Sequence, residues 1–245
     1  GDRSSAAKIG LIEFDRGNFA AAKKYLLDSK DRKFGEKIAI AEISLIEEKG
    51  EFDPKSVEVE LIAALEKSIR DFPKSPEAVY RRLTLAEKTQ NRERKKVLYQ
   101  ETISAAEELI RSPEKLEGLD YSTADLKVAI AEAWAGIGEK YRDIAAWTVA
   151  AMDYRGRRKS ENERGYSLEL AYCLWKKGAI AEAEGIYQKF EGLYPNEFTF
   201  YHAHANMAFE LGKLSEAQSL QEKAFAYSYG DNKLRAGYNL AKILK

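Results

Sequence analysis

Apolar residues recur at intervals of three and four along most of the chain, the spacing that places them on one face of an α-helix. The clearest stripes are Ile62, Leu65, Ile69 and Phe72, followed by Ile103, Ala106, Leu109 and Ile110. The spacing predicts helices near 55–72, 76–89, 91–111, 122–138 and 140–153, and a terminal helix near 231–244. Ser75 is expected to cap the second of these helices, with Pro76 at its first helical position.

A phrase of small and apolar residues around a glycine recurs at an offset of 34 residues in the C-terminal third. The matched pairs are Gly178 with Gly212, Ile180 with Leu214, and Ala183 with Ala217. The phrase recurs at the N-terminus around Gly17 and, more loosely, around Gly138. The glycine ends a helix because it tolerates φ > 0, and the alanine lets the next helix approach closely. The period therefore predicts stacked helix pairs.

At these residues the sequence resembles the tetratricopeptide repeat (TPR), of bacterial type. The positions that fit the family pattern are Ala171, Gly178, Ile180, Ala183, Tyr187, Phe190 and Pro195, then Ala205, Gly212, Leu214, Ala217 and Ala224. The resemblance implies an all-α fold, a right-handed superhelical solenoid of antiparallel helix pairs. Six pairs and a terminal helix give about 13 helices.

We expect a single TPR-like α-solenoid over 1–245. Within it lie N-terminal repeats (1–53), divergent TPR-like helices (54–160), and two clear units followed by the terminal helix (161–245). The basic run 155–160 is the best candidate for a flexible break between two parts of the solenoid.

Composition narrows the function. The 40 basic and 40 acidic residues give a net charge of zero, which argues against a nucleic-acid partner. Cys173 is the only cysteine, and His202 and His204 are the only histidines. These counts exclude an internal disulfide, an all-cysteine metal site and a three-histidine site, and no cofactor is expected. The longest apolar stretches fall far short of the roughly 20 residues that span a bilayer, so we expect no membrane insertion.

The resemblance also implies a binding surface, because the first helix of each TPR pair lines a concave groove. Carried over on the register of Gly178 and Gly212, the groove-facing positions predict a partner-binding set: Leu168, Tyr172, Trp175, Lys176, His202, Asn206, Phe209, Arg235, Asn239 and Lys242. Glu210 falls on the same face.

Part of this set resembles the TPR domains that grip the C-terminal carboxylates of chaperone tails, where Lys, Asn and Arg occupy comparable positions. A cationic and amide-lined patch suits a carboxylate. In this chain His202 stands where the first Lys is expected, so the charge of the patch at pH 7 depends on the protonation of this histidine. A solvated polar helix face is the favoured alternative.

Other candidates have plainer interpretations. His202 and His204 are two residues apart, so they point away from each other on a helix and do not share a metal ion. Cys173 is expected to be a small buried residue without a catalytic role. The three tryptophans are expected to pack between helices, and the densest basic cluster is expected to be a solvated face: Trp134, Trp147 and Trp175; Arg81, Arg82, Arg92, Arg94, Lys95 and Lys96.

The sequence therefore favours a non-catalytic protein–protein interaction scaffold that holds a peptide or a partner helix in its concave groove. The alternative is a structural solenoid arm of a larger bacterial envelope protein or assembly, since the last expected helix has no second helix to pair with. An enzyme has no motif in its favour. The phrases at 72–80 and 194–198 look like those of bacterial envelope TPR proteins, which favours a periplasmic setting. The oligomeric state is left open.

Overall fold

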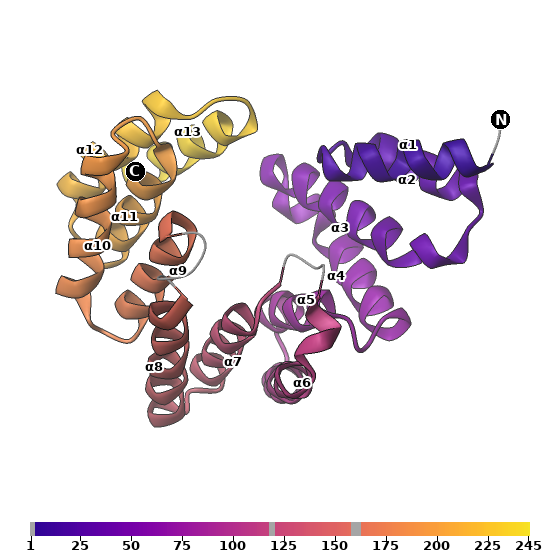
Figure 1. The fold of residues 1–245 in the computed structure, drawn as a ribbon, viewed down its shortest axis with the longest axis horizontal. Coiled ribbons are helices and arrows are strands. Elements are labelled where there is room, and N and C mark those ends of the chain that lie inside the picture. The colour runs from indigo at the N-terminus through magenta and orange to yellow at the C-terminus, as the bar shows by residue number, and fades with distance from the viewer. Residues whose placement is uncertain (1–2, 118–120, 158–162) are drawn as a thin grey trace. The chain divides into compact units, whose positions relative to one another are not determined.

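The computed structural model describes residues 3–117, 121–157 and 163–245 (Figure 1). Over these ranges the chain forms thirteen α-helices and two short 3-10 helices, without a strand. The α-helices are α1 (Arg3–Asp15), α2 (Phe19–Ser29), α3 (Gly35–Phe52), α4 (Pro54–Asp71), α5 (Pro76–Lys88), α6 (Arg92–Arg111), α7 (Thr123–Ile137), α8 (Lys140–Arg157), α9 (Glu163–Lys176), α10 (Ile180–Leu193), α11 (Phe198–Glu210), α12 (Leu214–Tyr227) and α13 (Asp231–Ile243). The predicted all-α fold and helix count are confirmed for these residues.

Consecutive helices pack as pairs, α1 on α2 through α11 on α12, and each pair also contacts the next helix along the chain within its unit. The helices group into two compact units, Gly1–Tyr121 and Ser122–Lys245. The predicted break at 155–160 does not coincide with this division. Residues 155–157 form the end of α8, and 158–160 lie outside the described residues. The assignment of 1–245 to a single solenoid domain stays a prediction.

The repeat glycines act as the sequence predicts. Gly178 and Gly212 adopt φ of +93° and +74°, at the turns between the two helices of their pairs. Ala183 and Ala217 are fully buried in the second helix of each pair. Because a left-handed backbone favours glycine and a small side chain permits close helix packing, the TPR-like architecture of these pairs is confirmed.

In the first unit, Ser75 caps α5 as predicted. Its side-chain oxygen accepts a hydrogen bond from the backbone N–H of Ala78 at 3.2 Å. The solvated-face interpretation is wrong for Arg81 and Arg82, which are both buried on α5. The Arg82 guanidinium donates hydrogen bonds to the backbone carbonyls of Ala78 and Pro73. These carbonyl oxygens take the place of the solvent water expected at an exposed position. The other basic residues of that cluster lie on α6, where Arg92 and Arg94 are exposed.

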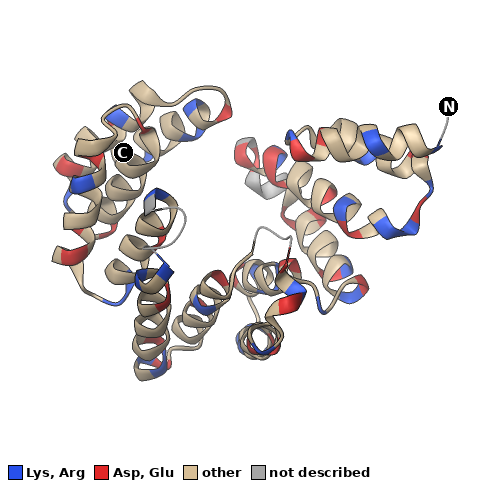
Figure 2. Ribbon diagram, in the orientation of Figure 1, with Lys and Arg blue, Asp and Glu red and all other residues tan. Residues whose placement is uncertain are grey.

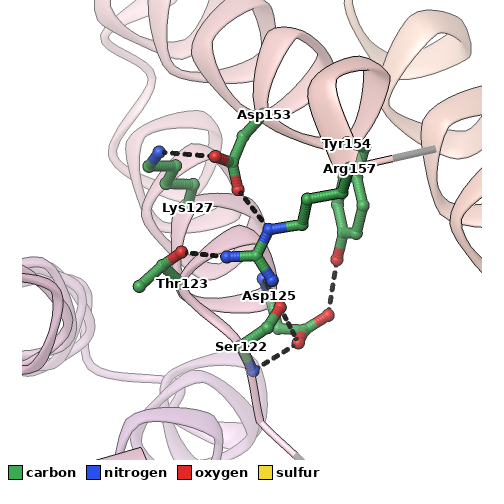
Figure 3. A network of polar contacts seen from close by, with 7 residues as sticks. All are labelled: Ser122, Thr123, Asp125, Lys127, Asp153, Tyr154 and Arg157. Atoms are coloured by element: carbon green, nitrogen blue, oxygen red, sulfur yellow. Dashed lines mark hydrogen bonds and ion pairs between the residues drawn. The ribbon is translucent and has the colours of Figure 1, made fainter. Parts of the chain in front are cut away.

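The second unit begins with a polar network between α7 and α8 (Figure 3). Asp125 closes the capping box at the start of α7, accepting from the backbone N–H of Ser122 at 2.7 Å. Its other carboxylate oxygen accepts from the buried Tyr154 hydroxyl at 2.5 Å. On the same pair of helices, Asp153 lies 3.3 Å from Lys127 and 3.4 Å from Arg157. The contacts of Tyr154 with Asp125 and of Asp153 with Lys127 join α8 to α7, and α9 packs against α8.

Basic and acidic residues are interspersed along the helices of both units (Figure 2). None of the helices in the described part of the chain has the length and apolar character needed to cross a membrane.

Candidate peptide groove

The second unit contains a pocket of about 440 Å³ between α9 and α11, the first helices of two successive pairs. We call it the groove pocket. Its lining residues are Leu168, Glu169, Tyr172, Trp175, Lys176, Tyr187, Ala203, Asn206, Phe209 and Glu210. Six of the ten residues predicted to bind a partner are therefore brought together here.

Helical spacing explains how these residues share one wall. On α9, Leu168, Tyr172 and Trp175 are four and three residues apart, which places them on one face of the helix. Ala171 and Leu174 lie between them in the sequence and are buried in the packing core of the unit. Trp175 belongs to the same core, and Leu168 and Tyr172 pack against it, so the face that lines the pocket continues into the packing of α9.

Aromatic rings form much of the wall. The Tyr172 and Trp175 rings meet edge to face with centroids 5.7 Å apart, and the buried Trp147 supports Tyr172 from behind at 5.6 Å. Trp175 is only 8% exposed, whereas Phe209 is 42% exposed on the α11 side. The wall is therefore packed at Trp175 and presents apolar area to solvent at Phe209.

Lys176 is the only cationic side chain among the lining residues. Its ammonium donates to Glu210 at 2.8 Å and lies 4.0 Å from the centroid of the Trp175 ring. An ammonium over an indole face is a favourable cation–π contact. The bond to Glu210 also joins α9 to α11 across the pocket.

The acidic side of the pocket centres on Glu169. Burial raises the pKa of its carboxyl, and the neighbouring carboxylates of Asp125 and Glu132 raise it further. Glu169 is nonetheless exposed on the wall. Glu132 stands behind Tyr172 and accepts a hydrogen bond from its hydroxyl at 2.8 Å, so burial and Glu132 both raise the pKa of Tyr172.

His202 does not line the pocket, although Asn206 does. The His202 ring is half-buried, with Nδ1 3.1 Å from Gln221 Oε1 and Nε2 3.3 Å from the Asn206 amide nitrogen. If Asn206 donates to Nε2 and Nδ1 donates to Gln221, both contacts are satisfied by one neutral tautomer. Burial lowers the pKa of His202, which favours that neutral form at pH 7.

The three predicted residues of α13 also lie outside the pocket. Arg235 and Lys242 are exposed and Asn239 is half-buried on that helix. The Gln221 amide donates to the backbone carbonyl of Ala236, which ties α13 to α12. The groove pocket is thus formed by α9 to α11. Of the residues that resemble a carboxylate-binding patch, only Asn206 lines it.

The remaining candidates are packed. His204 is buried, stacks on Tyr187 with ring centroids 5.3 Å apart and lies 2.8 Å from a Glu191 oxygen. Cys173 is fully buried, and burial raises the pKa of its thiol, as expected for a structural cysteine. Among the described residues no group of three or more His, Cys, Asp or Glu side chains is arranged to hold a metal ion.

Sequence reasoning missed Glu169, Tyr187 and Ala203 as pocket residues. Glu169 lies three residues before Tyr172, so helical spacing alone was a signal for its place on the same face. Tyr187 belongs to α10, the second helix of the pair, and a register of first helices cannot identify it.

No protein-family model and no curated protein matches the chain. Among solved structures it is similar to the TPR2AB-domain:pHSP90 complex of yeast Sti1, with 18% identity, a TM-score of 0.37 and coverage of 99% of this chain and 98% of that one. It is also similar to a tetratricopeptide repeat protein from Parabacteroides merdae, with 12% identity, a TM-score of 0.35 and coverage of 99% of both chains. At these TM-scores the assignment of the fold rests on the helix pairs themselves.

Proposed function

We propose that this protein is a non-catalytic interaction module that binds a peptide or a partner helix in the groove pocket of its second unit. The observation that supports the proposal is the placement of Tyr172, Trp175 and Phe209 around one pocket of about 440 Å³. Aromatic side chains with a packed base and an exposed edge are typical anchors of protein interfaces. Polar groups on Asn206 and Glu210 lie beside them and would orient a peptide backbone.

The direct test compares two aromatic truncations in the full chain. Phe209→Ala removes the exposed ring of the pocket, and Tyr141→Ala removes a ring that is 91% exposed on α8, outside the pocket. Peptides that the wild type captures from a displayed random-peptide library are labelled, and their affinities for the wild type and for both variants are measured by fluorescence anisotropy. Phe209→Ala is expected to weaken binding by about 2 kcal/mol, roughly thirtyfold, and Tyr141→Ala to leave it unchanged. Equal affinity in wild type and Phe209→Ala would refute the groove assignment.

The second candidate function is a structural subunit of a larger assembly. Large apolar side chains are exposed at the C-terminal end of the unit: Tyr229, Leu234, Tyr238 and Leu244. Such a group of side chains is typical of a surface that contacts another protein. Light scattering of the wild type and of a Leu234→Ser, Tyr238→Ser double variant tests it, since self-association that depends on these residues would give the wild type the larger mass.

A further inference from the structure

The charges of the groove pocket are unbalanced. Two carboxylates line it, Glu169 and Glu210, against one ammonium, that of Lys176. The ammonium is already paired, because it donates to Glu210 at 2.8 Å. The remaining charge on the wall is therefore negative and belongs to Glu169.

Glu169 has no hydrogen bond or ion pair with another described residue, whether from its own helix or from a neighbouring one. The charged groups that raise its pKa are the carboxylates of Asp125 and Glu132, which have the same sign. A carboxylate in this position loses part of its hydration and gains no counter-charge in return. A cation placed beside it would remove both disadvantages.

Lys176 shows what the pocket accepts next to an acidic group. Its ammonium lies over the aromatic wall, with Nζ 4.0 Å from the Trp175 ring centroid and 5.5 Å from that of Tyr172. The combination of an aromatic face and a carboxylate stabilises a long cationic side chain along its whole length. Glu169 lies seven residues before Lys176 on the same helix face. It is thus a second carboxylate, besides Glu210, that lies beside the aromatic residues of the pocket.

We propose that the groove pocket selects partner segments that carry an arginine or a lysine, whose cationic head pairs with Glu169 while its stem packs against Tyr172 and Phe209. This inference rests on the proposed function, because it names the chemistry of the peptide that the pocket would hold. Arginine suits the site especially well, since a guanidinium binds a carboxylate through two hydrogen bonds and also packs flat on aromatic rings.

The opposite choice, an acidic segment, finds little support in the same residues. His202 is directed to Gln221 and Asn206 and favours its neutral form, and the cations of α13 lie outside the pocket. An anionic side chain in the pocket would face Glu169 with Lys176 already engaged. Like charges in a partly desolvated site are strongly disfavoured.

The experiment uses short peptide pools in which one position is fixed as Arg, Lys, Gln or Glu and the others are mixed. Each pool is titrated into the full chain as wild type, Glu169→Gln, Glu139→Gln and Phe209→Ala. Glu139 is an exposed carboxylate at the turn before α8, away from the pocket, so Glu139→Gln is the matched control. Circular dichroism confirms that each variant is folded.

The proposal expects Arg- or Lys-fixed pools to bind the wild type roughly tenfold more tightly than Gln-fixed pools at the best position. Glu169→Gln should remove that preference and Glu139→Gln should retain it. A preference for Glu-fixed pools would overturn the inference, as would a preference for Arg that is retained in Glu169→Gln. If Phe209→Ala still weakens binding of every pool in that case, the proposed function stands. Pools that bind wild type and Phe209→Ala equally would instead overturn the proposed function, as would a wild type that binds none.

Discussion

The two units differ in how a charged side chain of a pocket is balanced, as a comparison of Arg81 on α5 with Glu169 on α9 shows. In the first unit, a pocket of about 180 Å³ on α3 and α5 includes Arg81, which is only 6% exposed. Burial lowers the pKa of its guanidinium, and the carboxylates of Glu77 and Glu36 oppose that shift. In the second unit, Glu169 lies on the wall of the larger groove pocket and forms no ion pair with another residue that the structure describes. The first unit supplies its own counter-charge, whereas the second leaves one position that a partner can fill.

The largest expected effect comes from removing the internal cation of the first unit. Arg81→Met leaves Glu77 and Glu36 facing each other without the cation that offsets their charge. Two guanidinium nitrogens of Arg81 are buried without a hydrogen-bond partner among the described residues, so we expect a smaller loss than for a hydrogen-bonded ion pair, about 2–3 kcal/mol in the free energy of unfolding at pH 7. Burial and Glu36 already raise the pKa of Glu77, and Arg81 opposes that rise, so the variant should raise it further. The loss should therefore shrink as pH falls and the carboxylates become protonated. Urea denaturation at two pH values measures both effects.

The matched control is Arg92→Met on the exposed face of α6, which should change stability by no more than about 0.5 kcal/mol. Adding Glu77→Gln to Arg81→Met should recover part of the loss. Equal stability of wild type and Arg81→Met would show that the buried guanidinium contributes nothing net, and the contrast between the units would lose its basis.

A smaller effect tests how the second unit holds its own buried polar groups. Tyr154→Phe removes the hydroxyl that donates to Asp125 at 2.5 Å (Figure 3). We expect a loss of about 2 kcal/mol, because a hydrogen bond to a charged acceptor is lost and the carboxylate stays in place. Thermal and urea unfolding measure the change. Tyr141→Phe alters a hydroxyl on the highly exposed ring of α8 and should have no effect, so similar losses in both variants would contradict the prediction.

Replacing two glycines of the second unit by alanine should change the free energy of unfolding in opposite directions. Gly178→Ala places a Cβ at φ +93° and should cost about 1 kcal/mol. Gly185→Ala lies within α10, where an added Cβ meets open space, and should stabilise the helix by up to about 1 kcal/mol. Chemical denaturation compares the two variants. Losses of equal size would mean that Gly178 is kept for a reason other than its backbone conformation.

These contrasts also show what the sequence could reveal. Periodicity located the helices, because burial of one face is a local property of the spacing. The register of Gly178 and Gly212 located Tyr172, Trp175 and Phe209 in the pocket, because consecutive pairs repeat the same packing. Local patterns carry this much information about a stacked repeat.

The rest depends on tertiary packing. Arg81 is interleaved with acidic residues like any solvated position, and only the fold shows that α5 buries it. The separation of Arg235 and Lys242 from the pocket depends on how α13 docks on α12 through Gln221, and that contact has no counterpart in the sequence pattern. Helical spacing could have placed Glu169 on the pocket wall, but that it has no ion pair with another described residue is seen only in the folded structure.

The smallest effect is also the one that separates a binding carboxylate from a structural one. In the folded chain the pKa of Glu169 is raised above its unfolded value, so the ionised form opposes folding at pH 7 and the protonated form does not. Glu169→Gln should therefore increase the free energy of unfolding at neutral pH, by a few tenths of a kcal/mol after allowance for solvent screening at this exposed position. Below pH 4.5, the ordinary value for this carboxyl, the two proteins should converge, because Glu169 is then protonated in both states. Unfolding measured by urea across this pH range tests the sign. If the Glu169 carboxylate stabilised the fold, Glu169→Gln would lower the free energy of unfolding instead. A carboxylate that binds a cationic partner lowers stability while no partner is bound, which is the usual trade between stability and function at a binding site.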